Sequence, residues 1–467
     1  MSNVSTFEQI DETPMTKRQY GILVAAILAD MLEFLDFFLL GFILSIIVVP
    51  WELTYLQTAF LVLTSGLGAI VGGFLWGYIA DRIGRRRVFI ATVLNFSLAT
   101  GALALVPEGN WFLLGVLRFL VGLGVGGLYS VDLPLVQEFV PSSKRGLMGG
   151  LVGLCIPLGG IVLGSALSAF LAPTIGWRGL VLIGVLPALL SLYIRSSVPE
   201  SPRWLINNGH REEAKRSIGW ALEIPPEEVR LPAEEEVVET SWRELFRYPR
   251  SLAVSWLGNL GMQTATYGIV LWGPTLLVLV LGISPPQAAF LFIFVGLSAF
   301  VGRIVFAFVS ELIGRRLTGG VVGFGAALFL LLAGVLPFDA TIAGLSLFYL
   351  MMLIAYFFTD GGFALVGPYA AEVWPTNLRT TGMGSAYGFG GLGKIVGPAG
   401  LALIAGTSDI VTPEATTAAL TPGFIFLASF GALAGVAYLL GFETRGKSIE
   451  EIDAELTIAS GQRAASA

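Results

Sequence analysis

Long apolar segments, separated by short polar links, fill almost the whole chain of 467 residues. A helix needs roughly 20 mostly apolar residues to cross a bilayer. Twelve segments have this character, at about 20–48, 56–80, 88–106, 111–139, 148–171, 178–197, 252–280, 287–309, 318–336, 341–371, 384–406 and 423–441. The pattern predicts an all-α membrane protein with twelve transmembrane helices.

A polar insert divides these helices into two sets of six. The predicted regions are an N-terminal tail (1–19), a first six-helix bundle (20–198), a central loop (199–250), a second six-helix bundle (251–441) and a C-terminal tail (442–467). Lysine and arginine are almost confined to the tails, the insert and the links that follow even-numbered helices. Because basic loops stay on the cytoplasmic side, we expect a multi-pass protein of the cell (inner or plasma) membrane with both termini in the cytoplasm.

A charged motif occurs once in each half, at the ends of corresponding helices. Its residues, related by shifts of 230 or 234 positions, are Asp81, Arg85, Glu138 and Arg145 in the first half and Glu311, Arg315, Glu372 and Arg379 in the second. Gly84 and Gly314 each follow the acid by three residues, and a glycine permits a tight turn there. The repeat predicts two pseudo-symmetric halves with a substrate site between them, and a cytoplasmic gate made of these charges.

The composition narrows the class of protein. Hydrophobic residues make up 55% of the chain and charged residues only 13%, about half the share in soluble proteins. The net charge of −6 gives no reason to expect a nucleic-acid partner. One cysteine and one histidine leave no internal disulfide and no cysteine-cluster metal site. With no histidine-paired nucleophile motif and no phosphate-binding loop of the Walker type, we expect neither an enzyme nor a cofactor nor a metal.

Several motifs together resemble those of the major facilitator superfamily of transporters, over essentially the whole chain. They are Gly77-x-x-x-Asp81-Arg-x-Gly-Arg-Arg86, Arg118-Phe-Leu-Val-Gly122-Leu-Gly124-Val-Gly126, Pro199-Glu-Ser-Pro-Arg-Trp-Leu205 and Glu443-Thr-Arg-Gly-Lys-Ser-Ile-Glu-Glu-Ile452. The last two are similar to the sugar-porter, organic-ion and synaptic-vesicle-protein branches, and Glu33-Phe-Leu-Asp36 resembles a motif of aromatic-acid/proton symporters. The resemblance implies alternating access, driven by an ion gradient.

Three acids on the first helix are candidates for proton coupling. Asp30, Glu33 and Asp36 fall within about 120° of one another on an ideal helix. Burial and mutual repulsion favour the protonated form of at least one of them, and ionisable groups inside a membrane helix usually have a function. The alternative is that one or more are structural partners. Asp132 of the fourth helix is a further candidate, although it lies nearer the cytoplasmic end and also suits a gate.

Two intramembrane cations are candidates for holding a substrate carboxylate. Arg118 of the fourth helix could bind it with its guanidinium fork, or be the permanent partner of a first-helix acid. Lys394 of the eleventh helix could contact the substrate, or pair with Asp360. The other predicted lining residues are Asn259, Gln263 and Tyr267 on one face of the seventh helix, and Tyr356 with Asp360 on the tenth. Arg303 of the eighth helix looks like a gate residue.

The leading hypothesis is a monomeric, proton-coupled symporter of a small organic acid, with aromatic acids among the candidates. Its partners would be a small-molecule substrate, protons and the lipid bilayer. Three alternatives stay open: an organic-cation or drug carrier, since buried acids outnumber buried cations; a sugar carrier, although the sugar-porter Gln-Gln…Asn signature is missing; and a transporter-like receptor.

Overall fold

The computed structural model describes residues 6–141, 144, 150–151, 153–186, 188–189, 198–231, 242–375, 378–447, 451–453 and 455–456, without the side chains of residues 6–8, 128–137 and 380. The chain forms two compact units. Unit 1 comprises Met1–Leu39 and Thr64–Val237, and unit 2 comprises Leu40–Leu63 and Val238–Ala467. Two helices, α2 (Lys17–Ile47) and α3 (Tyr55–Ile83), therefore begin in one unit and end in the other.

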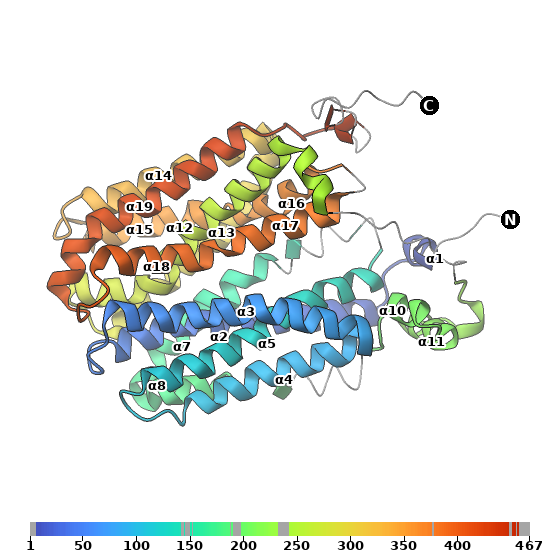
Figure 1. Ribbon diagram of the computed structural model, residues 1–467, viewed down its shortest axis with the longest axis horizontal. Coiled ribbons are helices and arrows are strands. Elements are labelled where there is room, and N and C mark those ends of the chain that lie inside the picture. The colour runs from blue at the N-terminus through green and yellow to red at the C-terminus, as the bar shows by residue number, and fades with distance from the viewer. Residues whose placement is uncertain are drawn as a thin grey trace. The chain divides into compact units, whose positions relative to one another are not determined.

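The rest of unit 1 is helical in the part of the chain that the structure describes (Figure 1). Its elements are α1 (Thr6–Glu12), α4 (Arg85–Leu103), α5 (Trp111–Phe139), the π-helical turn η1 (Pro157–Leu163), α7 (Gly164–Phe170), α8 (Ala172–Ile183), α10 (Pro202–Asn207), α11 (Arg211–Leu222) and the short 3₁₀ turn η2 (Pro226–Glu228). Asn110 begins α5 by accepting a hydrogen bond from the backbone N–H of Leu113 at 3.1 Å, as an N-cap residue does.

Unit 2 is built around α12 (Pro249–Leu281), which contacts most of its other long helices. These are α13 (Pro285–Ile313), α14 (Arg315–Val335), α15 (Leu347–Thr359), α16 (Phe363–Glu372), α17 (Arg379–Gly391), α18 (Gly393–Ala405) and α19 (Pro413–Leu439); the 3₁₀ segment η3 (Trp242–Arg247) precedes α12. Helices α14 and α19 run side by side (Figure 1). Buried Met262, Phe306, Tyr369, Trp374 and Tyr438 are among the larger members of its hydrophobic core.

The helices agree with the predicted spans, and the main differences have local causes. Residues 341–346 form a hairpin of β1 (Thr341–Ile342) and β2 (Leu345–Ser346), so the predicted span 341–371 becomes helical only after the cap residue Ser346. Helix α19 begins ten residues before the predicted start at 423, because Thr412 caps it and Pro413 suits its first turn. Eight described helical segments are long and apolar enough to cross a membrane. Helix α2 is also long enough, but it contains the charged residues Asp30, Glu33 and Asp36.

Two predicted spans of unit 2 contain a local turn near their middle. In the tenth span, α15 ends at Thr359 and α16 begins at Phe363, but the backbone at Asp360 and Gly362 stays helical, and the N–H of Asp360 donates to the carbonyl of Tyr356 at 3.0 Å. In the eleventh span, a turn at Leu392 separates α17 from α18, so Lys394 lies in the first turn of α18. Each span therefore continues as one helical segment long enough to cross a membrane.

The segment that joins α2 to α3 belongs to unit 2 because it bonds with the link before α19. Thr54 and Ile410 form a β-bridge, and the backbone N–H of Leu56 donates to the carbonyl of Thr407 at 3.1 Å. The hydroxyl of Tyr55 lies 2.7 Å from that of Thr416, and its ring stacks on Trp272. These contacts fix this connection against α12 and α19.

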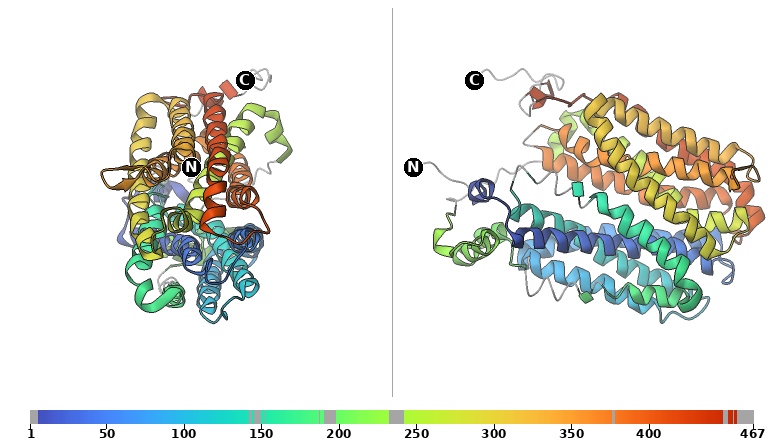
Figure 2. Two further views of the ribbon diagram at one scale, coloured as in Figure 1. Left: turned by 90° about the vertical axis from the view of Figure 1, so that its left-hand side faces the viewer. Right: turned by 180° about the vertical axis from the view of Figure 1, so that it is seen from behind.

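The N-terminal tail and the central loop pack against each other in unit 1. Helix α1 lies beside α11 (Figures 1 and 2), and Ile10 is buried against Ile218 and Leu222. The amide of Gln9 donates to the carbonyl of Glu228 and accepts from the N–H of Arg230, each at 3.1 Å. The two segments, separate in the sequence, therefore form one small subdomain.

Candidate functional site

A buried ion pair joins α2 to α5 in unit 1. The guanidinium of Arg118 lies 3.2 Å from the carboxylate of Asp36, and both side chains are only 1% exposed. Arg118 also donates to the hydroxyl of Ser65 on α3 at 2.9 Å, and Thr100 on α4 donates to Asp36 at 2.7 Å. Four helices thus meet at one charge pair. The geometry matches the sequence alternative in which Arg118 is the partner of a first-helix acid.

The other first-helix acids are also buried. Asp30 and Glu33 lie on the same helix as Asp36 and are 3% and 2% exposed. The π-helical turn η1 packs against this part of α2, with Gly159 against Met31 and Gly160 against Phe38. Such turns are frequent at functional sites. The side chain of Asp132 lies outside the described residues.

In unit 2, α12 and α18 bring together Lys394 and the polar stripe of the seventh span. The ammonium of Lys394 lies 5.2 Å from the centre of the Tyr267 ring, a cation–π contact. Lys394 forms no ion pair with any carboxylate that the structure describes. Asn259 and Gln263 are buried and pack against Gly390 of α17. The predicted substrate residues of the seventh and eleventh spans are therefore neighbours.

Helix α12 carries several buried polar side chains that have no hydrogen-bond partner among the described residues. Buried side-chain atoms without a hydrogen-bond partner among the described residues include Asn259 Oδ1, Thr264 Oγ1, Thr266 Oγ1, Trp272 Nε1 and Thr275 Oγ1. Buried polar atoms normally have partners, but these five side chains point to more than one face of α12 and do not define a single site.

A second buried ion pair lies at the turn between α15 and α16 in the tenth span. Arg303 of α13 donates to Asp360 at 2.7 Å, and the hydroxyl of Tyr356 donates to the other carboxylate oxygen at 3.3 Å. The sequence alternative in which Asp360 pairs with Lys394 is not the arrangement found, because Arg303 is the partner of Asp360. The expected gate role of Arg303 stays a prediction.

The first charged loop turns at Gly84, whose φ of 103° suits glycine. Arg85 binds Glu138, and the hydroxyl of Ser201 donates to the same carboxylate. Glu200 accepts from the backbone N–H of Arg86 at 2.9 Å, at the start of α4. The carboxylate of Asp81 is exposed and forms no ion pair within the described chain; Arg145 lies outside the described residues.

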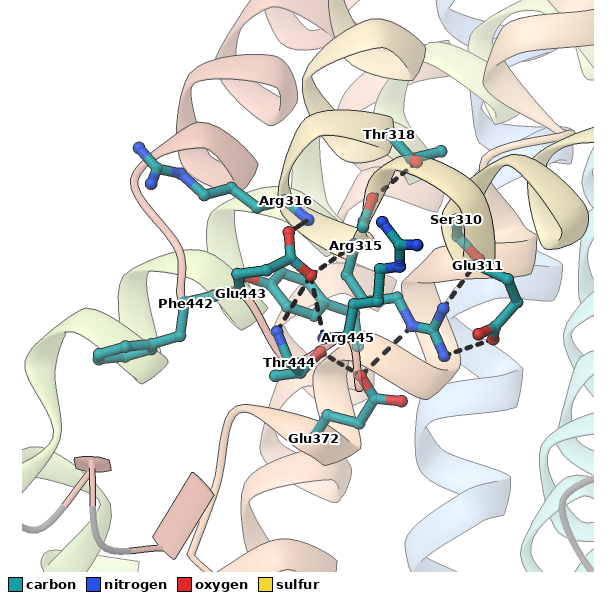
Figure 3. A network of polar contacts seen from close by, with 12 residues as sticks. Ser310, Glu311, Arg315, Arg316, Thr318, Glu372, Phe442, Glu443, Thr444 and Arg445 are labelled. Atoms are coloured by element: carbon teal, nitrogen blue, oxygen red, sulfur yellow. Dashed lines mark hydrogen bonds and ion pairs between the residues drawn. The ribbon is translucent and has the colours of Figure 1, made fainter. Parts of the chain in front are cut away.

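The second loop repeats this arrangement (Figure 3). Arg315 lies 2.7 Å from Glu311 and 3.4 Å from Glu372, and Thr444 donates to Glu372 at 2.5 Å. Glu443 accepts from the backbone N–H of Arg315 at 2.9 Å and of Arg316 at 3.2 Å. Arg379, the remaining predicted gate residue, lies 4.0 Å from Asp453 and not beside Glu372.

Sequence reasoning missed the residues that cap both loops. Glu200 and Ser201 correspond to Glu443 and Thr444 at a shift of 243 positions. Each pair supplies one carboxylate for a helix N-terminus and one hydroxyl for the glutamate that binds the loop arginine, Glu138 or Glu372. Negative charge is stabilised at a helix N-terminus. The signal available in the sequence was an acid followed by a hydroxyl residue after the sixth and the twelfth span.

Replacing Glu443 by alanine is expected to destabilise unit 2 by about 1–2 kcal/mol, the usual cost of losing a helix N-cap. Backbone N–H groups at the start of α14, and those of Thr444 and Arg445, would lose their acceptor. Thermal unfolding of the purified protein in detergent would show a lower Tm. The control is Glu227→Ala, which removes an exposed acid; an equal loss in both variants would contradict the capping role.

Comparisons with known proteins agree with this geometry. Residues 12–456 match the sugar (and other) transporter family. The niacin transporter NiaP of Acinetobacter baylyi is 32% identical over 460 residues, which cover 95% of this chain and 98% of that protein. The cis,cis-muconate transport protein of the same species is 27% identical, covering 79% and 83%. The inward-open xylose transporter XylE of Escherichia coli has the same fold, with a TM-score of 0.69 and 19% identity over 94% of this chain and 99% of XylE.

The family match spans nearly the whole chain, and the first of these relatives exceeds 30% identity over almost its full length. Relatives and family are transporters and not enzymes, as predicted from the missing catalytic motifs. The chain belongs to the sugar (and other) transporter family of the major facilitator superfamily and is a multi-pass membrane transporter.

Proposed function

We propose that this protein is a proton-coupled symporter of a small organic acid that works by alternating access, with both termini in the cytoplasm. The observation that carries the proposal is Lys394, an intramembrane cation without a carboxylate partner in the described chain. Lys394 is partly buried; a charge inside a membrane helix is costly unless it is paired, and a substrate carboxylate is a suitable partner. The names of the niacin and muconate relatives support the same substrate class.

In this proposal, an acid of the first helix carries the proton that is coupled to transport. Asp36 holds Arg118 when it is ionised and would release it on protonation, so one proton changes the charge and contacts of four helices. Substrate residues are Lys394, Tyr267, Asn259 and Gln263, and Arg118 is proposed as a further substrate ligand once it is released. The two loop networks are proposed to break and re-form during the transport cycle.

Uptake by reconstituted protein tests the proposal. Proteoliposomes would be given radiolabelled nicotinate, an organic cation or a pentose, each with and without an acidic outside pH. We expect nicotinate uptake that rises with the pH gradient and is lost with a protonophore. Nicotinate uptake that ignores the pH gradient would exclude proton coupling, and the absence of organic-acid uptake would exclude the substrate class.

One observation favours a second candidate, an organic-cation carrier. Asp30, Glu33 and Asp36 are all buried on α2, and Arg118 provides a positive partner for Asp36. Carboxylates in a membrane helix can bind a cationic substrate as well as a proton. Saturable uptake of the organic cation in the same assay, without uptake of nicotinate, would establish this alternative.

A further inference from the structure

The link between α2 and α3 is bound to the link between α18 and α19 by backbone hydrogen bonds. Thr54 and Ile410 form an antiparallel β-bridge. On one side of the bridge, the N–H of Val411 donates to the carbonyl of Leu53 at 3.0 Å. On the other side, the N–H groups of residues 55 and 56 donate to the carbonyls of residues 409 and 407, each at 3.1 Å. We call residues 53–56 and 407–411 the outer clasp.

The end of α2 shapes the first segment of the outer clasp. The N–H of Glu52 donates to the carbonyl of Val49 at 3.1 Å, and the N–H of Leu53 donates to that of Val48 at 3.0 Å. These are the two bonds of a Schellman motif, which ends a helix with a residue in the left-handed conformation. Glu52 has that conformation, with a φ of 49°. The motif buries Leu53, which is 1% exposed, and places Thr54 in the bridge.

Tyr55 anchors the outer clasp to the helices of unit 2. Its hydroxyl lies 2.7 Å from that of Thr416 on α19, and its ring stacks on Trp272 of α12. The same three side chains line a pocket within unit 2, whose other walls are mainly apolar residues of α12, α18 and α19. Because this pocket leaves space beside the anchor, Tyr55 can move without disturbing a close-packed core.

The outer clasp connects segments of both predicted six-helix bundles, although all of its residues belong to unit 2. Residues 53–56 follow α2 and lead into α3, which are helices of the first bundle, whereas residues 407–411 lie between two helices of the second. With both termini in the cytoplasm, as proposed above, α2 leads away from one cytoplasmic tail and α19 leads toward the other. The outer clasp therefore lies on the external side of the membrane.

We propose that the outer clasp is the external gate of this carrier, closed in this structure and opened in each transport cycle. This inference rests on the proposed alternating access and goes beyond it by naming the contact that closes the outside. Entry of a substrate between the bundles requires the ends of α2 and α3 to leave α12 and α19. The hydrogen bonds of the clasp are individually modest, because water can replace each of them, so the clasp opens reversibly. A covalent bond in its place would not.

A disulfide in place of the β-bridge tests this inference. The hydrogen bonds of the clasp flank Thr54 and Ile410, which makes them a non-hydrogen-bonded pair with Cα atoms typically about 4.5 Å apart. Disulfides join Cα atoms that are about 4.4–6.8 Å apart. The one native cysteine, Cys155, is first replaced by serine. In Thr54→Cys/Ile410→Cys, we expect oxidation to abolish nicotinate uptake by proteoliposomes, and dithiothreitol to restore it.

A matched control places a disulfide in the hairpin of β1 and β2. Thr341 and Ser346 are also partners in an antiparallel pair, but both belong to the second predicted bundle. Oxidised Thr341→Cys/Ser346→Cys should therefore take up as much nicotinate as the same variant after reduction. The single variants Thr54→Cys and Ile410→Cys should likewise be insensitive to the oxidant, because neither contains a second thiol.

The inference is overturned if the clasp disulfide forms, as shown by the loss of free thiols, and uptake continues. It is also overturned if the two cysteines do not cross-link in the membrane, since the two segments then do not meet there. Loss of uptake on oxidation of the hairpin variant would overturn it as well. In each of these cases, uptake by the reduced protein leaves the proposed function standing.

Thiol labelling tests the outer clasp without any substrate, so it is decisive even if the reduced protein takes up no organic acid and the proposed function fails. Val411 is 2% exposed in the closed clasp, and a cysteine at this position should react with a maleimide only when the clasp opens. We expect Tyr55→Phe, which removes the bond to Thr416 and keeps the ring on Trp272, to label Val411→Cys several-fold faster. Equal labelling rates with and without Tyr55→Phe would overturn the inference.

Discussion

Asp36→Asn is expected to abolish the accumulation of substrate against its gradient while sparing substrate exchange across the membrane. Asparagine keeps an oxygen for Arg118 and Thr100 but can neither ionise nor take up a proton. A difference of one pH unit is worth about 1.4 kcal/mol per proton and can sustain about tenfold accumulation. In the variant, we expect the internal substrate concentration to rise until it equals the external concentration and no further.

The measurement is uptake of labelled nicotinate into proteoliposomes, with and without an acidic outside, together with counterflow in the absence of a gradient. Glu33→Gln is the matched control on the same buried face of α2. If Asp36→Asn still accumulates substrate and Glu33→Gln does not, the proton is carried by Glu33. If both variants accumulate substrate normally, neither Asp36 nor Glu33 couples transport to protons, and Asp30 is the remaining candidate on this helix.

Sequence patterns predicted the helices well because membrane spans depend on local composition. Each of the twelve apolar segments overlaps helical residues of the structure. The local turns near Asp360 and at Leu392 were not predicted, since the glycines nearby are compatible with a regular helix as well as with a distorted one. The hairpin at 341–346 was missed because its residues are nearly as apolar as a span.

Pairings between distant residues were harder to predict than helices. Arg118 and Asp36 are 82 residues apart in the chain, and Arg303 and Asp360 are 57 apart. Helical periodicity places each residue on a face but does not say which faces meet. The sequence alone therefore left open whether Arg118 binds an acid or the substrate. It also left open whether Lys394 contacts the substrate or pairs with Asp360. The repeat predicted a gate made of these charges without saying which acid pairs with which arginine; the structure pairs Arg85 with Glu138 and Arg315 with Glu372. Glu200 and Glu443 lacked an obvious role until the helix starts were known.

Lys394→Ala is expected to weaken the binding of nicotinate by roughly 1.5–3 kcal/mol, about 10- to 150-fold in Kd, which is the scale of a hydrogen bond to a charged group. Lys394 contacts Tyr267 through its ammonium and has no carboxylate partner in the described chain, so its removal leaves no protein charge unpaired. The lost free energy should therefore report the substrate contact. Isothermal titration or a binding assay in detergent measures it directly.

Two companion variants distinguish charge from packing at this position. Lys394→Arg keeps the positive charge and should retain most of the affinity. Tyr267→Phe keeps the ring beneath the ammonium and should cost much less than Lys394→Ala. A cationic substrate predicts the opposite sign, because removing Lys394 would remove a repulsive charge and leave the affinity for the cation unchanged or improved. Since the two hypotheses predict opposite changes for one substitution, Lys394→Ala decides the sign of the transported charge, independently of how the transport is driven.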